Sequence, residues 1–148
     1  STFPEYRVTQ GTNFPVSSLC FDASANEVAY FRFLAINYGS GNLTLDIHWE
    51  ADTASSGDVV WSAAIAAITP DTDTQNIETK SFATANTVTD THLGTTGQRL
   101  HKATITISNL DSIAANDEVY LKVSRSSSGN TMTGDAQLTS MKLSYSDT

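Results

Sequence analysis

The segment 43–50 constrains the fold more than any other stretch of this sequence. Its residues alternate between apolar and polar, Leu-Thr-Leu-Asp-Ile-His-Trp-Glu. Because successive side chains of a strand point to opposite faces, this alternation predicts one dry face and one wet face. A half-buried strand of this kind is typical of an antiparallel sheet with one face packed on a core. We therefore expect the dry face, which ends in Trp49, to anchor the hydrophobic core.

The rest of the chain predicts more strands, joined by turn sequences rich in Ser, Thr, Asn and Gly. We expect an all-β fold, an antiparallel β-sandwich in the form of an eight-stranded jelly roll. Residues 1–17, which include Pro4 and Pro15, are expected to form an extended N-terminal arm, and 18–148 a single jelly-roll domain. The predicted strands lie in 18–22, 27–37, 43–50, 59–67, 79–89, 101–109, 118–125 and 136–145.

The last predicted strand changes its alternation partway along. Apolar residues stand at even positions up to Leu138 and at odd positions from Met141 onward. One extra residue between the two groups would return both to the same face of the sheet. The sequence therefore predicts a β-bulge near Thr139 and Ser140.

The net charge of the chain excludes some classes of binding partner. The 148 residues include 16 acidic and 8 basic side chains, which gives a net charge of −8. Nucleic-acid binding needs clustered Lys and Arg, so we expect no nucleic-acid partner. No apolar run is long enough to span a bilayer, and negative charge opposes contact with anionic lipid, so we also expect no membrane partner. Cys20 lies between Leu19 and Phe21 and is expected to be a buried apolar residue.

The wet face of segment 43–50 carries the densest group of side chains that can exchange protons or bind a metal ion, Asp46, His48 and Glu50. Positions two apart on a strand are about 7 Å apart, so these groups diverge too much to close a metal site without ligands from neighbouring strands. We interpret the row as a solvated or partner-facing surface. His92 and His101 are likewise expected on exposed positions or in loops.

Catalytic motifs are missing from the sequence. It contains no Gly-x-Ser-x-Gly elbow, no His-Glu-x-x-His, no phosphate loop and no dinucleotide fingerprint. We expect no catalytic residue, no metal ligand and no enzyme activity. Oxygen-rich loops such as Asp71-Thr-Asp73 and Asp90-Thr-His92 keep a structural Ca²⁺ open as an alternative to no cofactor.

The aromatic residues allow two interpretations. Trp49 and Trp61 both stand on dry faces, so we expect them to share the core across the sheet. A carbohydrate-binding β-sandwich would instead present aromatic rings on a wet face or in loops. Tyr38 and Tyr120 are the candidate glycan contacts under that alternative.

Several segments, taken in order, resemble small jelly-roll virion proteins of tailed bacteriophages, of the decoration, cement or fibre type. The resemblance covers most of residues 18–146. It rests on Tyr38-Gly-Ser-Gly followed by Leu-Thr-Leu-Asp-Ile-His-Trp-Glu-Ala-Asp, on Ala54-Ser-Ser-Gly-Asp-Val-Val-Trp61, on Asp117-Glu-Val-Tyr-Leu-Lys-Val-Ser-Arg125, and on Gly134-Asp-Ala-Gln-Leu-Thr-Ser-Met-Lys-Leu143.

This resemblance implies a non-enzymatic structural protein on the surface of a virion. Such a protein would bind a major capsid or tail protein and would commonly be a homotrimer. The segment 27–37 is apolar on both faces, and the N-terminal arm is rich in aromatic residues, which fits contacts between subunits. We expect those contacts at Phe3, Tyr6, Phe14, Phe31 and Phe33.

Overall fold

The computed structural model describes residues 3–148, and the regular structure of this range is β apart from one 3₁₀ helix, η1 (Ile77–Thr79). No helix in this range is long and apolar enough to cross a membrane. The strands are β1 (Glu5–Gln10), β2 (Pro15–Phe21), β3 (Val28–Leu34), β4 (Ser40–Ala51), β5 (Asp58–Ile68), β6 (Asn86–Thr91), β7 (His101–Ile107), β8 (Glu118–Arg125) and β9 (Ala136–Ser146).

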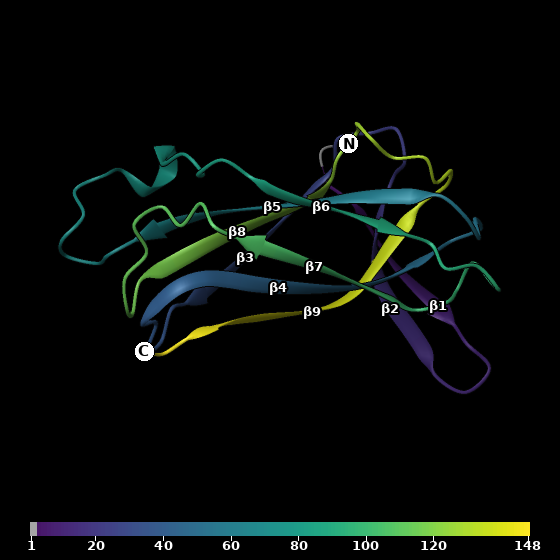
Figure 1. Cartoon of the computed structure of the whole chain (residues 1–148), viewed down its shortest axis with the longest axis horizontal. Coiled ribbons are helices and arrows are strands. Elements are labelled where there is room, and N and C mark those ends of the chain that lie inside the picture. The colour runs from purple at the N-terminus through teal and green to yellow at the C-terminus, as the bar shows by residue number, and fades with distance from the viewer. Residues whose placement is uncertain (1–2) are drawn as a thin grey trace.

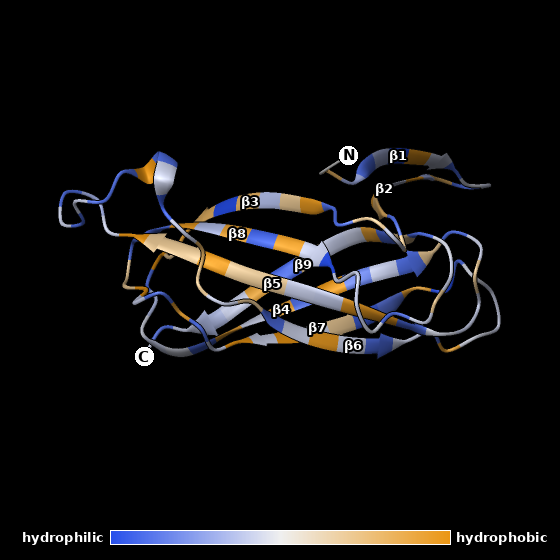
Figure 2. Ribbon diagram, turned by 90° about the horizontal axis from the view of Figure 1, so that it is seen from above, coloured by the Kyte–Doolittle hydropathy of each residue, from blue (hydrophilic) through white to orange (hydrophobic). Residues whose placement is uncertain are grey.

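Two antiparallel sheets face each other and form a sandwich (Figures 1 and 2). Sheet A has the strand order β1-β2-β9-β4-β7, and sheet B has the order β3-β8-β5-β6. When β1 is set aside, each sheet has four strands, and the chain crosses between the sheets in the manner of a jelly roll. The predicted antiparallel sandwich is confirmed, and β1 is an additional strand at the edge of sheet A.

Strand β4 has the two faces that its sequence predicts. Leu43, Leu45, Ile47 and Trp49 are completely buried, and the polar residues between them are half-buried. The rings of Trp49 and Trp61 lie 6.4 Å apart between centroids, so both tryptophans share one core as expected. They meet between the sheets rather than across one sheet, because the chain passes from sheet A to sheet B between β4 and β5.

Strand β9 contains the predicted bulge. Its register against β4 shifts where His48 lies opposite Ser140 and Trp49 lies opposite Leu138, which leaves Thr139 as the extra residue. The bulge keeps Leu138 and Met141 on the core side of the sheet despite their different parity.

Residues 5–21 form a β-hairpin rather than an extended arm. Strands β1 and β2 pair over the whole of β1. The Gly11 N–H donates to the carbonyl of Phe14 over 3.1 Å, and a Cβ at position 11 would lie 2.5 Å from that carbonyl oxygen. The sharp turn therefore requires glycine, and it lets the backbone of β1 find its hydrogen-bond partners on β2. The predicted boundary after residue 17 consequently falls inside a strand.

The hairpin is attached to the sandwich by the pairing of β2 with β9 near its base and by Arg7, whose guanidinium lies 3.1 Å from a carboxylate oxygen of Asp52 and 3.7 Å from one of Asp135. Among the described residues of β2, Leu19–Phe21 pair with β9, whereas Pro15–Ser18 pair with β1 alone. The tip of the hairpin consequently reaches away from the long axis of the sandwich (Figure 1).

The connection between β5 and β6 folds along sheet B. The Ala83 N–H donates to the carbonyl of Ile65 over 2.9 Å, which continues the edge of β5 beyond its pairing with β6. The ammonium of Lys80 lies 2.9 Å from a carboxylate oxygen of Asp111 and fixes the connection to the loop before β8. Ala66 on the outer face of β5 is buried as a result.

Candidate functional site

The polar row of β4 does not assemble into a reactive centre. Asp46 accepts a 2.7 Å hydrogen bond from Thr104, which holds the pKa of that carboxyl below its usual value. His48 Nδ1 lies 3.1 Å from the hydroxyl of Ser140, and burial raises the pKa of Glu50. Each group thus has its own local environment. In residues 3–148, no three His, Cys, Asp or Glu side chains are placed to hold a metal ion.

Two of the three histidines, His92 and His101, are buried. His92 lies in the loop after β6, which is one of the expected positions, whereas His101 stands in β7, so the expectation of an exposed position or a loop is wrong for His101. The ring of His101 stacks on Trp49 at 4.6 Å between centroids, and the ring of His92 lies 4.3 Å from that of His101. Asp90 accepts a 2.8 Å hydrogen bond from the indole N–H of Trp49 beside them. The cluster closes the end of the core where β6, β7 and the loop after β6 meet.

The histidine rings act as acceptors for the backbone of that loop. His92 Nδ1 accepts from the Gly94 N–H and His101 Nε2 accepts from the Leu93 N–H, each over 3.0 Å. These bonds assign an acceptor nitrogen to each ring, and burial together with the neighbouring His92 lowers the pKa of His101. His101 Nδ1 has no hydrogen-bond partner in the described structure. The arrangement secures a loop and offers no nucleophile.

The aromatic residues predicted as partner contacts fall into two groups. Tyr6 and Phe14 belong to the hairpin and expose 67% and 69% of their surface, and Val8 beside them is also exposed. Phe3 precedes the hairpin, is exposed as well, and contacts Tyr30 edge-on at 6.3 Å between ring centroids. Tyr6, Val8 and Phe14 therefore expose apolar side chains on the projecting hairpin, whereas Phe3 contacts sheet B.

Phe31 and Phe33 form the second group and lie on the inner side of β3. They are half-buried and line a groove of about 310 Å³ between the edge of β3 and the neighbouring stretch of β9. We name this the lateral groove. Its lining residues are Phe31, Arg32, Phe33, Leu45, Leu121, Met141, Leu143 and Tyr145. The sequence pattern predicted that these phenylalanines contact another subunit, but it did not predict the groove that they line.

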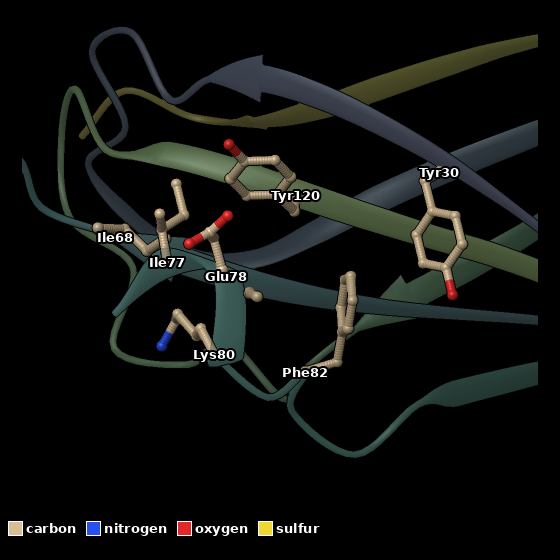
Figure 3. A pocket seen from close by; sticks show the side chains of 8 residues that line it. Tyr30, Ile68, Ile77, Glu78, Lys80, Phe82 and Tyr120 are labelled. Carbon is tan, nitrogen blue, oxygen red and sulfur yellow. The ribbon is translucent and has the colours of Figure 1, made fainter. Parts of the chain in front are cut away.

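A second groove, of about 400 Å³, lies on the outer face of sheet B, and we name it the sheet B groove. Tyr120 and Tyr30 stand on the sheet, and Phe82 rises from the β5–β6 connection toward Tyr30, with 6.0 Å between the two centroids (Figure 3). Lys122 lies 5.2 Å above the ring of Phe82. Glu78 places a carboxylate at the same groove (Figure 3).

The two tyrosines predicted as glycan contacts have different surroundings. Tyr120 borders the sheet B groove, and its hydroxyl donates to Glu118 over 2.8 Å. Tyr38 is buried, and its hydroxyl donates to the carbonyl of Gly41 over 2.7 Å. Tyr38 therefore offers no ring to a ligand, because the turn that follows it folds over the phenol. Tyr30 and Phe82 were missed, since only the folding of the β5–β6 connection brings them together.

Comparisons with known proteins bear on the fold. No protein-family model matches this chain, and no curated protein matches it. Among solved structures it is similar to CBM28, a carbohydrate-binding module specific for non-crystalline cellulose, with a TM-score of 0.50 and 8% sequence identity over 95% of this chain and 82% of the module. At this identity the similarity shows the β-sandwich fold alone.

Proposed function

We propose that this chain is a non-enzymatic structural protein of a virion, of the decoration or cement type. It binds the capsid or tail surface through a major capsid or tail protein, assembles as a homotrimer and stabilises the particle. The resemblance of its strand and turn segments to phage virion proteins supports this proposal. The absence of converging catalytic groups in residues 3–148 is compatible with it.

The observation that carries the proposal is the apolar surface of the projecting hairpin. Tyr6, Val8 and Phe14 are exposed on an element that the rest of the domain does not cover. A two-stranded hairpin is marginally stable in water, and each large apolar side chain gains about 1.5–3 kcal/mol when it is buried. An assembly partner that covers these side chains therefore stabilises both the hairpin and the complex.

Stabilisation of the particle would follow from mass action. A subunit that binds the assembled shell, and not its dissociated components, lowers the free energy of the assembled state in proportion to the logarithm of its concentration over its dissociation constant. The net charge of −8 keeps such a subunit soluble at high local concentration and favours docking on a basic surface.

Sedimentation with virions whose genome encodes the chain tests this function. Purified protein is added to particles from which it has been removed, and the bound fraction is measured after centrifugation. We expect saturable binding that is weakened at least tenfold by Tyr6→Asp with Phe14→Asp. The matched control is Leu100→Asp, which changes another exposed apolar residue away from the hairpin. Failure of the wild-type protein to bind the particles would contradict the proposal.

Glycan binding in the sheet B groove is a second candidate function. The rings of Tyr30, Phe82 and Tyr120 border a groove that also carries the Glu78 carboxylate. Apolar and aromatic walls with a few polar groups are the usual lining of a small-ligand site, and sugars present both a C–H face and hydroxyl groups to such a lining. The structurally similar CBM28 is itself a carbohydrate-binding module.

Affinity electrophoresis in gels that contain soluble polysaccharides distinguishes this candidate from the first. Glycan binding predicts retardation of the wild-type chain that is lost in Phe82→Ala and in Tyr30→Ala, and kept in Leu93→Ala. Equal mobility of all four proteins across a panel that includes soluble cellulose derivatives would remove this candidate. The virion proposal would be unaffected by that result.

A further inference from the structure

One edge of β9 is open over most of its length. Among residues 3–148, β2 pairs with Ala136–Leu138 of β9, and no strand pairs with 139–146 on the side away from β4. An unpaired strand edge presents N–H and C=O groups that bind another strand readily. The backbone of β9 therefore has a vacant place beside it for one strand of about eight residues.

The side chains at this open edge divide into an apolar and a polar face. Met141, Leu143 and Tyr145 point to the core side, where they line the lateral groove together with Phe31 and Phe33. Lys142 points outward, lies 3.9 Å from a carboxylate oxygen of Asp46 and exposes 73% of its side chain, so it can also meet a second carboxylate. Arg32 at the rim of the lateral groove takes part in none of the ion pairs within the described range. A strand that fits here needs an apolar face toward the groove and an acidic residue on its outer face.

Strand β1 has these two faces. Tyr6 lies opposite Leu19 of β2, so Tyr6 and Val8 are on the core face of sheet A, but β1 lies beyond the sandwich and leaves them exposed. Glu5 and Arg7 occupy the outer face, where they form a 3.0 Å ion pair, and Arg7 also pairs with Asp52 and Asp135 of its own chain. The edge of β1 away from β2 has no strand beside it in the described structure.

We propose that β1 of one copy of this chain pairs with residues 139–146 of β9 in a second copy. Sheet A then continues from one subunit into the next, and Tyr6 and Val8 cover the lateral groove of the neighbour. Glu5 meets the outer face that carries Lys142. This inference rests on the proposed function, because it names the neighbour that the hairpin contacts in the assembly.

The geometry of this contact makes it head to tail. The hairpin and the lateral groove are different surfaces of one molecule, so every copy offers one of each to its neighbours. Repetition of such a contact closes into a ring when the rotation between neighbours permits, and a ring of three agrees with the proposed homotrimer. Tyr6 and Val8 are then covered by the neighbouring copy, whereas Phe14 of the hairpin stays exposed and remains for the shell.

Light scattering coupled to size exclusion tests this pairing on the isolated protein, without virions. We expect the wild-type chain to be a trimer, and both the hairpin variant Tyr6→Asp with Val8→Asp and the groove variant Met141→Lys to be monomers. An equimolar mixture of the two variants should give a one-to-one dimer, because one intact hairpin and one intact groove remain. Leu100→Asp should stay trimeric.

A second groove-side variant guards against misfolding of Met141→Lys. Lys142→Glu changes a side chain that is mostly in solvent and should raise the dissociation constant of the oligomer at least tenfold while the melting temperature of the fold is kept. A monomeric wild type, an oligomer that persists in the hairpin variant, or a mixture of variants that stays monomeric would each overturn the pairing. Particle binding by a monomeric wild type would overturn this pairing and the homotrimer, while the proposed binding to the virion surface would hold.

Discussion

At the scale of single residues, Arg125 holds together the loops at one end of the sandwich. Its side chain is almost completely buried and has no carboxylate beside it within hydrogen-bond distance. The guanidinium donates instead to the carbonyls of Phe21, Met132 and Gly134 and to the side-chain oxygen of Asn130. A planar group with five donors suits this set of acceptors from separate segments.

Replacement of Arg125 should therefore destabilise the fold strongly. We expect Arg125→Met to lower the free energy of unfolding by about 3 kcal/mol, since hydrogen bonds to a charged group contribute roughly 1.5–3 kcal/mol each and the acceptors would lose their donor. Arg125→Lys should recover only part of this, because a single ammonium cannot reach the acceptors that are spread around the edge of the guanidinium plane. Urea denaturation measures both variants, and equal stability of Arg125→Met and wild type would contradict this role.

The buried histidine pair predicts a dependence of stability on pH. The pKa of His101 is lowered in the folded state, so the unfolded chain, with a pKa of about 6.5, binds the proton more readily. The stability due to neutral His101 is thus fully present above about pH 6.5 and is lost as the pH falls from there toward the folded pKa. Protonation also removes the acceptor for the Leu93 N–H.

Urea denaturation of wild type and His101→Gln between pH 5 and 8 checks this expectation. Glutamine keeps an acceptor for the loop and does not titrate, and the raised carboxyl pKa values of Glu50 and Asp135 affect both proteins alike. The difference in unfolding free energy between the two proteins should change in favour of the variant as the pH falls below about 6.5. A difference that is constant over the whole range would refute the assignment.

At the scale of elements, the sequence pattern predicted best those strands that have one dry face. Strands β4, β7 and β8 alternate cleanly, because each packs one face on the core, and the parity change at Thr139 indicated the bulge. Strand β1 was missed because its apolar residues face solvent, so the pattern carried no signal of burial. The burial of His92 was missed for a related reason, since its neighbour Trp49 comes from a distant segment.

The bulge in β9 is expected to be required for the stability of the fold. Deletion of Thr139 would remove the extra residue and turn either Leu138 or the segment from Met141 onward to the wrong face of the sheet. We expect a loss of several kcal/mol in unfolding free energy, as for other errors of strand register, whereas Thr139→Ser should change stability by less than about 1 kcal/mol. Thermal denaturation followed by circular dichroism compares the two variants, and a deletion variant that melts with wild type would show that the bulge is dispensable.

At the scale of the whole molecule, the all-β class and the sandwich followed from alternation and turn residues, because both depend on local sequence. The two grooves could not be predicted from local sequence. The lateral groove depends on β3 and β9 lying near each other in space, and the sheet B groove depends on the path of the β5–β6 connection. The partner contacts were predicted as a single set, whereas Tyr6 and Phe14 project from the hairpin and Phe31 and Phe33 line a groove. Because the hairpin residues and the groove residues lie on different surfaces, the hairpin of one copy can contact the groove of another.

The copy number of the chain in particles tests directly whether it is a structural component of a virion surface. Purified virions from a lysate of the virus that encodes the chain are analysed by quantitative mass spectrometry against the major capsid protein. We expect the chain to be present at a fixed ratio and in a multiple of three copies per particle. Its absence from intact particles, or an amount that varies freely between preparations, would contradict the claim.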